Sequence, residues 1–78
     1  METDSFPGGV RLTRSPLGGH VVEWNGRFIG WLHASYGDKW NAYVRGAEPG
    51  VTGLPLGRFT ENEAVRRIAI EAGWPGSE

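Results

Sequence analysis

Basic side chains recur through the middle of this 78-residue chain, interleaved with aromatic and amide groups. Arginine and lysine can neutralise phosphates, and arginine, asparagine and tyrosine can also hydrogen-bond to base edges. The residues that could do this chemistry are Arg27, Lys39, Asn41, Tyr43, Arg45 and Arg58. Within "KWNAYVRG", alternate residues would share one face of a β-strand. The pattern predicts a surface for an anionic partner, although any one such charge is more often a solvated surface group.

The net charge of −1 conceals an uneven distribution. Residues 10–58 contain six basic and three acidic residues, a net charge of +3, whereas residues 1–9 and 59–78 each carry −2. The central region is therefore mildly basic between acidic flanks. Dedicated nucleic-acid binders usually have a larger basic excess, so this asymmetry permits such a partner without requiring one.

Catalytic and metal chemistry find little support in the residue types. The chain has no cysteine, which excludes disulfides and thiolate chemistry. His20 and His33 should lie close together in the predicted hairpin, but no cysteine or carboxylate cluster completes a metal site. No Ser/His/Asp set and no phosphate-binding glycine loop is evident. We expect a non-enzymatic protein without a cofactor.

The elements that must position these residues begin with a β-hairpin. Asn25-Gly26 separates two β-branched and aromatic runs, which is typical of a two-residue hairpin turn. That turn would pair Trp24 with Arg27 and, in regular register, His20 with Trp31. A second turn at residues 35–38 leads to a third strand at residues 39–46, with Trp40, Ala42 and Val44 on one face. Residues 10–13 could form a short edge strand, and residues 54–59 a short extended segment.

A helix follows over residues 61–72. Thr60 and Glu63 have capping-box spacing, Gly73 suits the C-terminal cap, and Pro75 prevents continuation. The apolar stripe comprises Ala64, Val65, Ile68, Ala69 and Ala72, with Ile70 outside it. The sequence therefore predicts an α+β fold, a three-stranded antiparallel meander packed on one C-terminal helix. The single domain would span residues 10–74, with a flexible segment at residues 1–9 and a flexible tail at residues 75–78.

One helix covers only one face of a sheet, yet the regular register predicts two apolar faces. Val22, Trp24, Ile29 and Trp31 would lie on one side, and Val21, Phe28, Gly30 and Leu32 on the other. Three explanations remain open: the N-terminal segment covers the second face, a second copy of the chain covers it, or it is a recognition surface. For a protein partner, the candidate residues are Trp24, Ile29, Trp31 and Ile70.

Targeting signals are not apparent. No apolar run approaches the roughly 18–20 residues of a membrane span, and the start "METDSFPGG" is acidic where a signal peptide would be basic. We expect a cytoplasmic protein that does not contact a membrane.

A longer pattern runs from Arg27 to Ala72. Gly30 is followed by "GDKWNAYVR", then by "LGRF" (residues 56–59), and then by Glu63-Ala64 at the start of the helix. This pattern resembles the DNA-binding domains of the plant ethylene-response-factor type and the arm-binding domains of phage integrases. The resemblance implies that the helix packs behind the sheet, that Tyr43 and Arg45 face double-stranded DNA, and that a phage or mobile-element regulator is a reasonable setting.

The sequence also departs from this family. Apolar residues (Ile29, Trp31 and Leu32) surround Gly30 where the plant domains carry arginines, and Pro55 replaces an expected tryptophan. Two hypotheses follow. The chain is a small DNA-binding module that uses the open face of its sheet, or it is a protein-interaction module, such as a phage-encoded inhibitor or a homodimer, that uses an apolar tryptophan-rich face.

Overall fold

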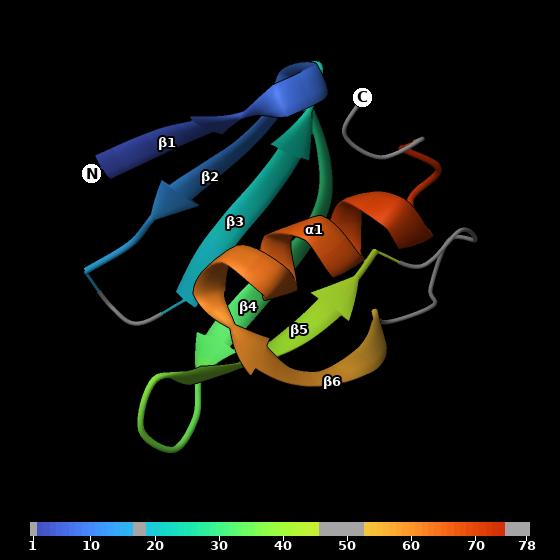
Figure 1. The fold of residues 1–78 in the computed structure, drawn as a ribbon. Helices are drawn as coiled ribbons and strands as arrows, with labels where there is room; N and C mark the ends of the chain where they lie inside the picture. The colour runs from blue at the N-terminus through green and yellow to red at the C-terminus, as the bar shows by residue number, and fades with distance from the viewer. Residues whose placement is uncertain (1, 17–18, 46–52, 75–78) are drawn as a thin grey trace.

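The computed structural model describes residues 2–16, 19–45 and 53–74. In them, six antiparallel strands form one sheet whose spatial order equals their order in the chain. The strands are β1 (Glu2–Phe6), β2 (Val10–Arg14), β3 (Gly19–Trp24), β4 (Arg27–Ala34), β5 (Lys39–Val44) and β6 (Leu54–Thr60). A 3-10 turn (Pro7–Gly9) joins β1 to β2, and α1 (Glu61–Glu71) packs across one face of the sheet (Figure 1). The α+β class is confirmed, but the expectation of a three-stranded sheet was wrong, because six strands are present.

The additional strands come from segments with weak sequence signals. Glu2–Phe6, assigned from the sequence to a flexible N-terminal segment, pairs with β2 and forms one edge of the sheet. Residues 10–14 consequently form an interior strand between β1 and β3 rather than an edge strand. Leu54–Thr60 pairs with β5 and forms the other edge. The expected tail at residues 75–78 lies outside the described residues.

Local signals correctly predicted the first hairpin and the helix. Asn25 and Gly26 both have positive φ, at 54° and 81°, as the two-residue turn requires. At the helix start, the Glu63 amide donates to Thr60 Oγ1 at 3.4 Å. The reciprocal half of the capping box is replaced, because the Glu63 carboxylate instead accepts from Arg67 Nε at 2.9 Å. Gly73 has φ 108° immediately after the helix, as expected of its C-terminal cap.

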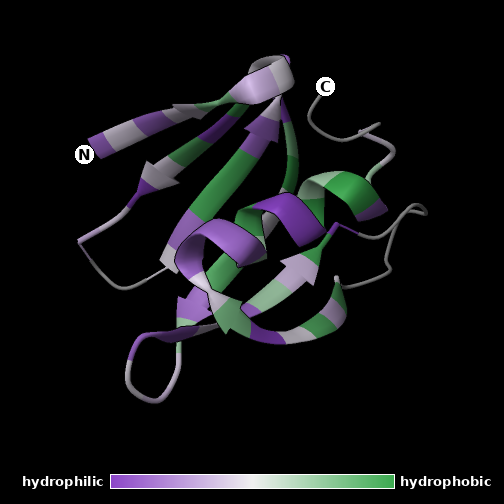
Figure 2. Cartoon of the chain, in the orientation of Figure 1, coloured by the Kyte–Doolittle hydropathy of each residue, from purple (hydrophilic) through white to green (hydrophobic). Residues whose placement is uncertain are grey.

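The core lies between the sheet and α1. Its buried residues are Val10, Leu12, Val22, Ile29, Leu32, Ala42, Val44, Ala64, Val65, Ile68, Ala69 and Trp74. Figure 2 shows the middle of β3 hydrophobic and the first turns of α1 hydrophilic on the side turned to the viewer. Among the described residues, no helix is long and apolar enough to span a membrane.

A β-bulge in β4 determines which of its side chains lie on each face of the sheet. Glu23 pairs with Phe28 as the Asn-Gly turn predicts, but Val22 pairs with Gly30, which leaves Ile29 as the extra residue. Ile29 and Gly30 are both buried. Gly30 has no side chain, and Ile68 of α1 lies against it. The predicted regular register beyond Glu23 was therefore wrong by one residue, and the bulge turns every later side chain of β4 to the opposite face.

Three of the four tryptophans belong to the helix side. Trp74 is buried, whereas Trp24 and Trp40 are partly buried and pack against the core cluster. Trp24 Nε1 donates to the Gly8 carbonyl at 3.1 Å, which connects the β3–β4 hairpin to the 3-10 turn. Because the bulge shifts the register, Trp31 pairs with Val21 and Tyr43 on the opposite, open face.

Candidate nucleic-acid interface

The face of the sheet that α1 leaves open carries a row of side chains, which we call the aromatic row after the Trp31 and Tyr43 rings at its centre. Val21, Trp31, Tyr43 and Pro55 are successive register partners across β3 to β6. The Trp31 and Tyr43 rings are nearly parallel, with centroids 5.4 Å apart, and the Phe28 and Trp31 centroids are 6.0 Å apart. Such stacked cross-strand pairs stabilise a sheet beyond the area that they bury. The row therefore stabilises the open face of the sheet independently of the helix.

Polar groups flank this row on the next line of register partners. His33 pairs with Asn41, and Asn41 pairs with Arg58, so the three side chains are neighbours across β4, β5 and β6. The His33 ring meets the Tyr43 ring edge-on, with centroids 6.1 Å apart. The amide of Asn41 and the guanidinium of Arg58 thus lie beside the aromatic row, where they could reach one ligand together.

Exposed cations complete the open face. Lys39, Tyr43 and Arg45 follow the alternation of β5, and Lys39 and Arg45 are exposed. Arg11 is exposed on β2, whose alternation buries Val10 and Leu12 on the helix side. Within the described part of the chain, no ion pair involves Arg11, Lys39, Arg45 or Arg58. The acidic residue in the strands of this face is Glu23, the register partner of Arg11.

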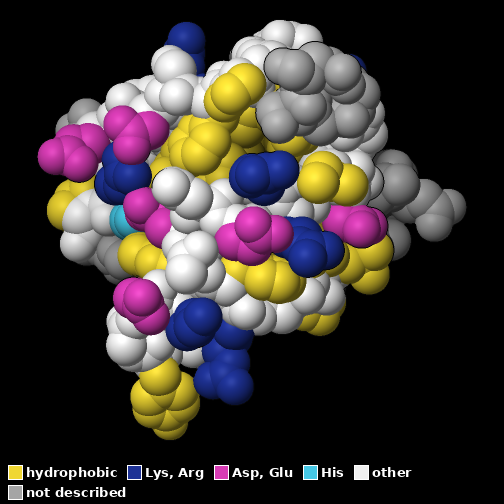
Figure 3. Space-filling model, viewed as in Figure 1, with side chains coloured by type: hydrophobic (Ala, Val, Ile, Leu, Met, Phe, Trp, Pro, Cys, Tyr) yellow, Lys and Arg dark blue, Asp and Glu magenta, His cyan; other side chains and the backbone are white. Residues whose placement is uncertain are grey.

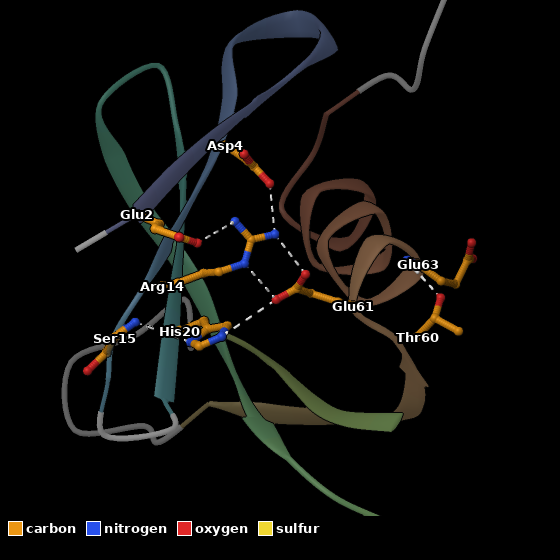
Figure 4. Close-up of polar contacts among 8 residues, drawn as sticks. All are labelled: Glu2, Asp4, Arg14, Ser15, His20, Thr60, Glu61 and Glu63. Atoms are coloured by element: carbon orange, nitrogen blue, oxygen red, sulfur yellow. Dashed lines mark hydrogen bonds and ion pairs between the residues drawn. The ribbon is translucent and has the colours of Figure 1, made fainter. Parts of the chain in front are cut away.

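On the helix side, Arg14 and Arg67 form ion pairs with acids. Arg14 lies between Glu2, Asp4 and Glu61, and the guanidinium donates to Glu61 at 2.8 and 3.1 Å (Figure 4). Hydrogen bonds to Glu61 and then to Asp4 raise the pKa of Arg14 above its ordinary value. Figure 3 shows acidic and basic side chains intermixed over this side. Arg14 and Arg67 are thus paired with acids, whereas Arg11, Lys39, Arg45 and Arg58 form no ion pair with another described residue.

The structure brings together most of the residues predicted for nucleic-acid contact. Lys39, Asn41, Tyr43, Arg45 and Arg58 share the open face. Arg27 does not join them, because it pairs with Trp24 at the hairpin end and so belongs to the other side of the sheet. Sequence reasoning omitted Arg11, although its position between the apolar residues Val10 and Leu12 signals an outward-facing strand position.

The alternative set of protein-interface residues is dispersed. Ile29 and Trp24 lie on the helix side, Trp31 lies on the open face, and Ile70 is exposed on α1. The two histidines are also separated: His20 is buried against Trp40, with ring centroids 4.5 Å apart, and His33 is exposed on the other face. The expected proximity of the histidines was therefore wrong. Among the described residues, no group of three potential ligands is placed to hold a metal ion.

Compared with protein families, curated proteins and solved structures, the chain matches none. The resemblance to ethylene-response-factor and integrase arm-binding domains therefore stays a prediction.

Proposed function

We propose that this protein is a small, non-enzymatic module that binds double-stranded DNA through the open face of its sheet. The observation that carries the proposal is the set of four exposed cations, Arg11, Lys39, Arg45 and Arg58, which have no ion pair among the described residues and flank an aromatic row. A folded sheet can enter the major groove, where base edges are read. Phosphate contacts would supply most of the affinity, and Arg45 and Tyr43 would supply base contacts.

The proposal is tested by anisotropy of a labelled random-sequence duplex at two salt concentrations. We expect salt-sensitive binding, because each phosphate that a cation neutralises contributes about 0.9 to the slope of log K against log salt. Arg45→Ala and Arg58→Ala should each weaken binding and lower that slope by about one. Arg27→Ala is the matched control, because it removes the same charge from the opposite side of the sheet. Equal losses in all three variants, or no binding at low salt, would contradict the proposal.

A protein partner is the second candidate, favoured by the apolar part of the same face. Val21 and Phe28 are 36% and 38% exposed beside Trp31, and aromatic residues with arginine are frequent interface hot spots. This alternative has two forms, in which the partner is either a second copy of the chain or a different protein. Light scattering on the same sample separates them. A dimer mass that Trp31→Ala converts to a monomer would assign the face to a second copy of the chain.

A further inference from the structure

A concave surface lies on the helix side of the sheet, between the β1–β2 hairpin and α1. Its walls are mainly apolar, and its volume is about 270 Å³. It is lined by Phe6, Pro7, Val10, Asn62, Val65, Arg66, Ala69 and Trp74. Figure 3 shows hydrophobic side chains lining a hollow at this place, with a Lys or Arg side chain on its rim. We call this surface the helix groove.

Apolar groups that are fixed in the fold form the floor of the helix groove. Val10, Val65, Ala69 and Trp74 are at most 6% exposed, so each is held by core packing rather than by a ligand. Phe6 and Pro7 form the opposite wall, at the junction of β1 and the 3-10 turn. Small-molecule sites are typically such pre-formed apolar concavities with a few polar groups that orient the ligand.

Two polar groups of α1, Asn62 and Arg66, lie one turn apart on the rim of the groove. Arg66 is exposed, and no ion pair connects it to any described residue, in contrast to Arg67, which pairs with Glu63. None of the described residues that line the groove is acidic. The charge of the rim is therefore positive, which suits a carboxylate held by the guanidinium fork.

We propose that the helix groove binds a small apolar carboxylic acid, with its ring or branched chain on Trp74, Val65 and Ala69 and its carboxylate on Arg66. The volume lies just below the roughly 300 Å³ at which drug-sized pockets begin, so a single ring or a short branched chain suits the groove. This inference does not depend on the proposed DNA-binding function, because the groove and the open face lie on opposite sides of the sheet.

The test uses 3-phenylpropionate as the probe, with 3-phenylpropanol and 2-phenylethylamine as neutral and cationic controls. Amide and indole resonances of the isotope-labelled full chain are followed during titration. We expect saturable shifts of the Trp74 indole and of the Val65 and Ala69 amides, with a dissociation constant on the order of millimolar for so small a ligand. The Trp31 indole on the open face should not shift.

Arg66→Gln should weaken binding of the acid about three- to tenfold and leave binding of the alcohol unchanged, because only the acid uses the charge. Arg67→Gln is the matched control, since it removes the same charge at the next position of α1, outside the groove lining. The absence of saturable shifts at the groove would overturn the proposal. Equal binding of acid and alcohol, or equal weakening by the two substitutions, would also overturn it.

Discussion

Arg14 of β2 and Glu61, the first residue of α1, are joined by two hydrogen bonds across 47 positions of the chain, Nε–Oε2 at 3.1 Å and Nη2–Oε1 at 2.8 Å. Both side chains are largely shielded from solvent, with exposures of 25% and 23%. Glu61 Oε2 also lies 3.5 Å from Nε2 of the buried His20 (Figure 4). This paired contact holds the beginning of the helix against β2 and β3 on the helix side of the sheet.

We expect a double-mutant cycle with Arg14→Met and Glu61→Gln to give a coupling of about 1–2 kcal/mol, because charge-assisted, two-pronged hydrogen bonds exceed surface ion pairs. Chemical denaturation of the parent chain, the two single variants and the double variant measures this coupling. Asp4→Asn is the control, since the Asp4 carboxylate contacts the same guanidinium at 2.7 Å but is 56% exposed. Its cost should be about 0.5 kcal/mol or less. Equal costs at the two acids would show that burial does not set the strength of the contact.

The contribution of Arg14 should be independent of pH through the neutral and mildly alkaline range. Its acidic partners raise the pKa of Arg14, so the stabilisation is fully present below the unfolded-state pKa and is lost only as pH rises through the folded-state value. The difference in unfolding free energy between the parent chain and Arg14→Met should thus stay constant between about pH 7 and pH 10. A difference that fades within this range would mean that another group controls the contact.

Gly30→Ala should lower the free energy of unfolding by about 1–3 kcal/mol, the usual cost of overpacking. An added Cβ would meet the Tyr43 carbonyl oxygen and the Ile68 side chain, neither of which can move without disturbing the core. Gly19→Ala is the matched control in β3, because among the described residues its added methyl group meets only the His33 ring, at 3.2 Å for the nearest atom. Thermal and urea melts of both variants check the prediction, and a neutral Gly30→Ala would refute the tight packing at the bulge.

Thr60→Ala should destabilise the protein by about 1 kcal/mol, because the Glu63 amide loses its capping oxygen. Thr60→Ser retains the hydroxyl and should remain within about 0.5 kcal/mol of the parent chain. Urea denaturation of the three proteins makes the comparison. Similar losses for alanine and serine would assign the effect to the Thr60 methyl group instead of to the cap.

The parts of the fold that were predictable are those with local causes. Asn25-Gly26 demands its turn and Thr60 caps its helix whatever the rest of the chain does. The bulge at Ile29 has a tertiary cause, the close approach of Ile68 to Gly30, which is not visible in the pattern of either strand. Strand β1 has no apolar alternation at all, and its side chains are mainly exposed, so only pairing with β2 and the contacts of Glu2 and Asp4 with Arg14 reveal it.

In the candidate interface, too, the placements with local causes were predictable from the sequence and those with tertiary causes were not. Asn41, Tyr43 and Arg45 share a face because strand alternation is a short-range rule, and the sequence was sufficient to predict it. The position of Trp31 depends on the bulge, so the regular register placed it with Trp24 and Ile29 on the wrong face. Arg58 joins Asn41 through the pairing of β5 with β6, which places the Arg58 side chain on the open face.

The strand order of the sheet, identical to the order along the chain, has a kinetic consequence. Each strand finds its partner immediately before or after it, so pairing closes only short loops. Folding rates rise as contacts become more local in sequence, so this sheet should assemble fast for a β-rich domain. The contact between Arg14 and Glu61 spans most of the chain and must wait for α1. It should therefore slow unfolding rather than speed folding.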